Sequence, residues 1–238
     1  MSELSYPYPE SSAQALACFK AYDVRGRVPD DLNETIAYRL GLAFAAQFAA
    51  RRVAVGHDIR HSSRPLLEAL ARGLYAGGAE VIDIGLCGTE EIYFATFHAG
   101  LDGGIMVTAS HNPADYNGMK LVRREARPVS GDSGLRELEH AVATSGAEPA
   151  GELRLTRRSY REEYVQHLLG YVDVPQLRPL KLVVNAGNGT AGLMIDALAS
   201  RLPFEFVRVH HEPNPDFPNG IPNPVSYTHL TLPTIYSV

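Results

Sequence analysis

The stretch GGIMVTASHNPADYNGMK, residues 103–120, decides how the rest of the chain is interpreted. It begins with an apolar run, continues through Ser110 and His111, and reaches Lys120 just after an Asn-Gly pair. Short apolar runs bounded by turn residues are typical of strands inside a parallel sheet. The pattern therefore predicts a strand over residues 104–108, followed by a serine, a histidine, a reversal at the Asn-Gly pair and a lysine.

Helices and strands alternate on both sides of this stretch. Apolar residues recur at every fourth position from Ile36 to Phe48, which predicts a helix with one buried face. Thr89, followed by two glutamates, is expected to cap another helix. The patterns predict helices at residues 31–50, 65–77, 89–99 and 133–143, and strands at residues 52–56, 80–85, 104–108 and 119–123. Strands joined by helices of this length form βαβ units and a largely parallel sheet.

A second α/β unit follows the small, polar segment at residues 144–151. Its patterns predict helices at residues 160–169 and 192–201, and strands at residues 181–185 and 204–209. Residues 226–238 contain no acid, no lysine or arginine and no glycine, so we expect a tail that is foreign to the rest of the chain. The predicted fold class is α/β, a three-layer α/β/α mixed sheet with a partial second α/β domain.

The composition is that of a globular protein, with 45% apolar and 21% charged residues among 238. The net charge of −5 is spread along the chain, so we expect no nucleic-acid partner and no membrane partner. Cys18 and Cys87 lie in no CxxC pair, which favours two buried, reduced thiols. The N-terminus does not resemble a signal peptide, and no apolar window approaches the roughly 20 residues that span a bilayer. We therefore expect a cytoplasmic protein.

The loop after residues 104–108 carries residue types that suit phosphoryl transfer. Ligand sites in parallel sheets lie at the carboxyl ends of strands, which predicts that the Ser110 hydroxyl faces a cleft. A serine near a base and a cation suits a covalent intermediate, and the Lys120 ammonium group is suited to holding a phosphate. A plain polar hairpin loop is an equal alternative here. Adjacent side chains such as Ser110 and His111 seldom point at each other, and no GxSxG elbow surrounds the serine.

A resemblance to a known family separates these alternatives. The stretch TASHNPADYNGMK resembles the active-site serine loop of the α-D-phosphohexomutases, and within that superfamily it is most similar to bacterial phosphomannomutases. Four further stretches resemble the same family, namely CFKAYDVRG, GTEEIYFATFHAGLDGGIMVTASHNP, NAGNGTAG and PDFPNGIPNP. The likeness extends from about residue 18 to residue 224.

The resemblance implies an isomerase that interconverts mannose 6-phosphate and mannose 1-phosphate. Ser110 would be a phosphoserine whose phosphoryl group passes to a hexose phosphate substrate, giving a hexose 1,6-bisphosphate intermediate. His111 and Lys120 match positions that assist proton transfer and charge stabilisation. Arg25 matches an arginine that steadies the transferring group, and Tyr22 lies in the same loop. The resemblance thus implies Tyr22, Arg25 and Lys120 as substrate-binding residues.

The resemblance also implies Mg²⁺, with one oxygen of phosphorylated Ser110 among its ligands. The family's aspartate-rich metal loop lies beyond the matched residues, so a single ligand remains here, whereas Mg²⁺ requires octahedral coordination. On the family pattern, residues 1–150 are domain I with the phosphoserine loop, residues 151–225 are a partial domain II, and residues 226–238 are a non-native tail. We expect little or no mutase turnover from such a chain alone.

Other functions stay open at this point. A phosphoglucomutase of the same family is the nearest alternative, because the missing sugar-binding region decides between mannose and glucose. Gly187, Gly189 and Gly192 form a GxGxxG pattern between a strand and a helix, as in NAD-binding dehydrogenases. One feature argues against a dehydrogenase. Glu205 lies at the start of its predicted strand, whereas the acid that binds the ribose lies at the end of such a strand. A non-catalytic module whose serine loop only holds an anion is a further alternative. The oligomeric state does not follow from the sequence.

Overall fold

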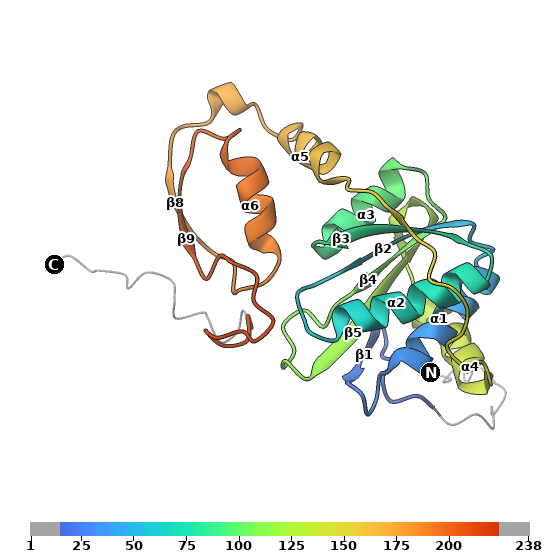
Figure 1. Cartoon of the computed structure of the whole chain (residues 1–238). Helices are drawn as coiled ribbons and strands as arrows, with labels where there is room; N and C mark the ends of the chain where they lie inside the picture. Colours follow the sequence, from blue (N-terminus) through green and yellow to red (C-terminus); the bar gives the residue numbers. More distant parts are fainter. Residues whose placement is uncertain (1–14, 224–238) are drawn as a thin grey trace, which may run out of the picture.

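A computed structural model of the chain describes residues 15–223, which form a large mixed sheet with its helices and a smaller α/β unit (Figure 1). The strands of the first part are β1 (Val24–Arg27), β2 (Arg52–His57), β3 (Glu80–Leu86), β4 (Gly103–Val107), β5 (Tyr116–Arg123), β6 (Arg127–Pro128) and β7 (Thr156–Arg157). Its helices are α1 (Glu34–Gln47), α2 (Ser63–Ala76), α3 (Thr89–His98), α4 (Arg136–Thr144) and α5 (Arg161–Leu169). The smaller unit contains β8 (Lys181–Asn185), α6 (Ala191–Ala199) and β9 (Glu205–Val209).

The large sheet is mixed, as predicted. Its strand order is β1-β5-β4-β2-β3-β7, with β6 paired to β5. β2 runs parallel to both β3 and β4, and β3 runs parallel to β7. β5 is antiparallel to both β4 and β1. The predicted strand at residues 104–108 is thus β4, in the middle of the sheet, and its carboxyl end lies beside that of β2.

The two faces of the sheet bury separate cores, which confirms the three-layer arrangement. Successive side chains of a strand point to opposite faces. Accordingly, Val53 and Val55 of β2 pack in the core under α1, α2 and α4, whereas Ala54 packs in the core that contains residues of α3. In β4, Ile105 joins the first core and Met106 the second. Figure 1 shows α1, α2 and α4 gathered on one side of the sheet.

The helices occur where the sequence predicts them, with ends set by local hydrogen bonds. The helix expected at residues 31–50 is the shorter α1, because the Asn33 side chain accepts the Ile36 N–H at 3.1 Å and caps the first turn. The prediction that Thr89 caps α3 is wrong. Gly88 is the N-cap, and the Glu91 carboxylate accepts its N–H at 3.0 Å. The acidic first turn therefore caps the helix one residue earlier than expected.

The reversal predicted at the Asn-Gly pair is also wrong. Asn117 and Gly118 lie inside β5, opposite Gly26 and Arg25 of β1. A side chain at Gly118 would place its Cβ 2.2 Å from the Val24 carbonyl oxygen, so this glycine is required by close strand packing. The chain instead reverses in the serine loop before β5. The strand β1 itself, which the sequence did not predict, forms the sheet edge that carries Arg25.

The smaller unit is a parallel pair of strands, β8 and β9, joined through α6. Figure 1 shows this unit beside the large sheet and connected to it through α5. Residues 226–238, expected to be a foreign tail, lie outside the described residues. Within residues 15–223, no helix is both long enough and apolar enough to cross a membrane.

Helices α1 and α2 pack through glycines at their crossing. A Cβ atom at Gly73 would lie 2.0 Å from the Tyr38 carbonyl oxygen, and one at Gly41 would lie 2.3 Å from the Leu70 carbonyl oxygen. Real Cβ atoms do not approach backbone so closely, so any side chain here must push the helices apart. The layer over one face of the sheet therefore depends on these two positions.

Gly73→Ala should accordingly lower the free energy of unfolding by about 2 kcal/mol, because overpacking outweighs the better helix propensity of alanine. Urea unfolding followed by circular dichroism measures the change. Gly146→Ala is the matched control, since a Cβ there meets nothing within 4 Å, and it should leave stability nearly unchanged. A stabilising effect of Gly73→Ala would contradict the packing described here.

Both cysteines are free and buried, as predicted. Burial raises the pKa of the Cys18 thiol from 9.0 to about 11, and it raises the pKa of the Cys87 thiol well above its usual value. Because the thiolate is the reactive form, a disulfide reagent at pH 8 should label the native chain slowly and the urea-unfolded chain rapidly. The folded state holds the Cys18 proton more tightly, so the contribution of this thiol to stability is complete below pH 9 and is lost as the pH rises through about 11. Rapid labelling of two thiols in the native chain would contradict this burial.

Candidate active site

Ser110 lies just beyond the carboxyl end of β4 in a strained backbone conformation. Its φ is 53°, in the left-handed region that residues with a Cβ rarely adopt. The Ser110 N–H donates to the Thr108 hydroxyl at 2.9 Å, and that hydroxyl donates to the Asp58 carboxylate at 2.7 Å. Because Asp58 follows β2 and Thr108 follows β4, the parallel pairing of the two strands brings them to one edge. The side chain of Ser110 is exposed at that edge.

His111 lies beside Ser110 but is only loosely associated with it. The His111 Nδ1 atom is 3.4 Å from the Ser110 Oγ atom, longer than an ordinary hydrogen bond, and the pair is exposed. The sequence argument that adjacent side chains seldom pair closely is consistent with this distance. His111 is therefore near enough to exchange a proton with a group at Ser110, although the two side chains form no tight hydrogen bond in this geometry.

Arg25 and Lys120 come together on Asp23, a residue that the sequence analysis did not single out. The Asp23 Oδ2 atom lies 2.7 Å from Arg25 Nη2 and 3.4 Å from Lys120 Nζ. Arg25 also donates through Nη1 to the Ala109 carbonyl oxygen, directly before Ser110, at 3.0 Å. In the described residues no hydrogen bond joins Lys120 to Ser110 itself. The antiparallel pairing of β1 with β5 places both cations beside the serine loop.

Tyr22 lies in the loop that precedes β1. Its side chain is 79% exposed, so it lies largely in solvent. The structure thus brings together Ser110, His111, Arg25 and, through Asp23, Lys120, while Tyr22 stays at the periphery.

Arg60 is the main side chain around the serine loop that the sequence analysis missed. Its guanidinium group donates to the main-chain carbonyl oxygens of Ser110, Asn112, Pro113 and Tyr116 at 2.5–3.0 Å. The residue is only 3% exposed, and this burial lowers the pKa of the guanidinium. Its Nε lies 3.4 Å from the Asp58 carboxylate, which pairs the buried charge. A sequence signal existed, because Arg60 follows the carboxyl end of β2, but only the fold shows that it meets the serine loop.

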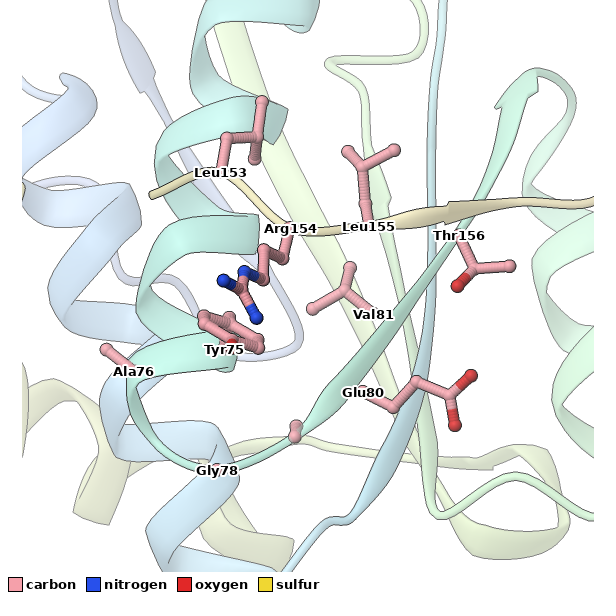
Figure 2. A pocket seen from close by; sticks show the side chains of 10 residues that line it. Tyr75, Ala76, Gly78, Glu80, Val81, Leu153, Arg154, Leu155 and Thr156 are labelled. Atoms are coloured by element: carbon pink, nitrogen blue, oxygen red, sulfur yellow. The ribbon is translucent and has the colours of Figure 1, made fainter. Parts of the chain in front are cut away.

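A cavity of about 260 Å³ opens at this edge of the sheet. The first part of the chain lines it with Ser110, Thr108 and Asp58, and the smaller unit lines it with Gly189, Thr190 and Phe217. A second cavity, about 910 Å³, lies at the start of β3, where Figure 2 shows Tyr75, Glu80 and Arg154 around it. The amino end of β3 is the opposite edge from Ser110, so the larger cavity is separate from the serine loop.

The described residues do not make a complete magnesium site. Within residues 15–223, no group of three or more His, Cys, Asp or Glu side chains is placed to hold a metal ion. The Asp58 carboxylate near Ser110 already accepts from the hydroxyls of Ser63 and Thr108 and faces Arg60. One phosphoserine oxygen alone cannot satisfy the near-octahedral coordination of Mg²⁺.

The glycine motif between β8 and α6 is filled by the chain itself. A Cβ at Gly187 would lie 2.5 Å from Pro222 Cβ, and one at Gly192 would lie 2.3 Å from the His211 carbonyl oxygen. The segment that follows β9 thus packs where a dinucleotide would need to approach the glycines. This close packing argues against the dehydrogenase alternative.

The fold and the serine loop define an α/β/α protein with an exposed serine at the carboxyl edge of a mixed sheet. The phosphoglucomutase/phosphomannomutase family matches twice, through its alpha/beta/alpha domain I at residues 17–148 and its alpha/beta/alpha domain II at residues 162–235. The chain belongs to this family, which confirms the resemblance seen in the sequence. The second match extends over most of the tail that we expected to be foreign.

Individual relatives agree with this membership. The chain is 61% identical over 212 residues to the phosphohexose mutases of Xanthomonas campestris and 54% identical over 220 residues to a phosphomannomutase of Salmonella typhimurium. These matches cover 88% of the chain and 47% and 48% of the relatives, so the chain spans about half the length of the curated relatives it matches.

Solved structures share the fold. A phosphoglucomutase/phosphomannomutase family protein from Burkholderia thailandensis matches with a TM-score of 0.79 and 34% identity, over 90% of this chain and 48% of that one. Parafusin, a phosphoglucomutase from Paramecium, matches with a TM-score of 0.72 at 18% identity, over 91% of this chain and 47% of that one. At that lower identity the likeness concerns the fold alone.

The strain at Ser110 can be measured by comparing two substitutions that both remove its hydroxyl. Ser110→Gly should be about 1 kcal/mol more stable than Ser110→Ala, because glycine adopts positive φ without penalty while alanine retains its Cβ. Urea unfolding measures both variants. The control pair is Ser145→Gly and Ser145→Ala, since Ser145 has an ordinary φ of −72°. There glycine should be no more stable than alanine, and the same result at Ser110 would show that the position is unstrained.

Proposed function

We propose that the chain carries the phosphoserine loop of a phosphomannomutase, which interconverts mannose 6-phosphate and mannose 1-phosphate through a hexose 1,6-bisphosphate. The carrying observation is the geometry of Ser110, an exposed serine held at the carboxyl edge of the sheet beside Arg25 and Lys120. The identity of 54% to a phosphomannomutase supports mannose over glucose as the sugar. A phosphoglucomutase of the same family is the alternative.

In the proposed reaction, the Ser110 Oγ atom attacks a phosphorus of the bisphosphate. The Oγ–P bond forms while the bond from that phosphorus to the sugar oxygen breaks, and the serine proton passes to the departing sugar phosphate through a nearby base. His111, with Nδ1 at 3.4 Å from Oγ, is the proposed base. This attack is the second half of the reaction. In the first half, the phosphoserine gives its phosphoryl group to the free hydroxyl of the incoming hexose monophosphate, which forms the bisphosphate. The bisphosphate then turns round, so that Ser110 takes up the phosphoryl group from the other sugar oxygen and the isomerisation is complete.

Arg25 and Lys120 supply positive charge to this transfer. Phosphoryl transfer depends mainly on positioning and electrostatic stabilisation of the moving group. Asp23 offsets part of the positive charge of Arg25 and Lys120 in this structure, and it also orients both side chains. We propose that a bound phosphate replaces Asp23 as the nearest anion of Lys120, because its 3.4 Å contact is the looser of the two. Tyr22, exposed at the rim, is the proposed outer substrate contact.

Mg²⁺ would neutralise charge on the phosphoserine when bound, with one ligand oxygen from phosphorylated Ser110. The described residues contribute no further ligand, so the other ligands belong to parts outside them. We also propose the division into domain I at residues 1–150, a partial domain II at residues 151–225 and a tail at residues 226–238. The proposed location is the cytoplasm, and the proposed partners are sugar phosphates only.

The proposal is tested by the mass of the intact chain. After incubation with glucose 1,6-bisphosphate, the wild-type chain should carry one added phosphate, whereas Ser110→Ala should carry none, because the accepting oxygen is gone. Ser145→Ala is the matched control and should keep the phosphate. Retention of the phosphate in Ser110→Ala, or its absence from the wild-type chain, would overturn the assignment of Ser110 as the carrier.

A further inference from the structure

An aromatic ring from the smaller unit covers the guanidinium group that holds the serine loop. The Arg60 guanidinium carbon lies 5.4 Å from the centre of the Phe217 ring, within the range of a cation–π contact. Phe217 is 6% exposed, so the contact is shielded from water. Figure 1 shows the last described segment, in red, next to the loop between β4 and β5. The segment after β9 therefore touches the serine loop through Arg60.

Phe217 is held in place by a network of main-chain hydrogen bonds. Its φ is 45°, its N–H donates to the Asn214 carbonyl oxygen at 3.2 Å, and its carbonyl accepts the Gly220 N–H at 2.9 Å. The Asn214 N–H donates in turn to the carbonyl of Asn188, in the glycine motif, at 2.9 Å. A left-handed, non-glycine residue persists only where its surroundings fix it. The glycine motif of the smaller unit thus anchors the turn that presents Phe217.

A second contact between the two parts lies next to the first. His61, adjacent to Arg60, has its Nε2 atom 2.8 Å from the Asp216 carboxylate, adjacent to Phe217. Both side chains are largely exposed, so this pair contributes little to stability. The pair joins the same two segments as the contact between Arg60 and Phe217, and it therefore helps to orient them.

We propose that Phe217 is a positioning residue for Ser110, acting through Arg60. The Nη1 and Nη2 groups of Arg60 donate to loop carbonyls, and the guanidinium carbon lies over the Phe217 ring. Shielding from water strengthens hydrogen bonds between the guanidinium and those carbonyls. The smaller unit, which supplies no nucleophile, therefore determines how rigidly the serine loop is held. The consequence for phosphoryl acceptance rests on the proposed function, whereas the mechanical coupling does not.

Hydrogen exchange of the loop amides tests the coupling. In the full chain, Phe217→Leu should speed exchange at the Ser110, Asn112 and Tyr116 amides by about fivefold, because the cation–π contact is lost. Phe217→Tyr keeps the ring and should stay near wild type. Tyr75→Leu is the matched control, because it removes a similar contact, Arg154 to Tyr75 at 5.6 Å, remote from the serine loop (Figure 2). It should leave the loop amides unchanged.

Two outcomes would overturn the proposal. The first is unchanged loop exchange in Phe217→Leu. The second is an equal increase throughout β2 and β4, which would indicate general destabilisation. Should Phe217→Leu also open β8 and β9, Phe217→Met provides the comparison with a longer, unbranched apolar side chain, and unchanged loop exchange there would count equally against the proposal.

A second readout separates this inference from the proposed function. The rate at which glucose 1,6-bisphosphate phosphorylates Ser110 should fall about fivefold in Phe217→Leu and recover in Phe217→Tyr, while the final extent stays the same. If no variant accepts phosphate but the loop amides respond as expected, the proposed function fails and the coupling stands. If phosphate is accepted at one rate by all variants, the positioning role fails while the proposed function stands.

Discussion

The serine loop takes its shape from one buried cation. Arg60 directs its guanidinium donors at main-chain carbonyl oxygens between residues 110 and 116, and a loop with no regular secondary structure is thereby fixed at several points. A buried guanidinium is costly to desolvate unless its hydrogen bonds are made, so loop and arginine each require the other. Asp58 offsets the charge and also orders Thr108, which in turn binds the Ser110 N–H. The left-handed backbone of Ser110 is supported by this set of contacts.

The sheet brings these groups together because of how its strands are paired. Parallel pairing of β2 and β4 sets Asp58 and Arg60 beside the end of the strand that leads to Ser110. Antiparallel pairing of β5 with β4 and β1 then returns the chain with Lys120 and Arg25 on adjacent strands. Mixed pairing thus brings cations from three distant stretches of sequence to the edge of the sheet that carries the serine loop.

The smaller unit contributes to the same edge through the turn that presents Phe217. Its glycine motif, which has the spacing of a dinucleotide fingerprint, packs against Pro222 and the main chain of His211. The glycines therefore allow a close approach of protein to protein. The glycine spacing alone therefore cannot identify a dinucleotide site. It indicates where something packs closely against the backbone, and the fold decides whether that neighbour is a ligand or another part of the chain.

Much of the architecture follows from the sequence alone. Apolar periodicity located every major helix and the central strands, and the quoted loop at residues 103–120 identified Ser110 and the family. The sequence did not determine the position of the reversal, because Asn117-Gly118 forms a turn by itself but lies in β5 once Gly118 must pass close to Val24. Nor did it single out Asp23, Arg60 or Phe217, whose roles come from contacts with residues distant in the chain. Local patterns fix local structure because they depend on neighbouring residues, whereas these contacts exist only after strands and units from across the chain have packed together.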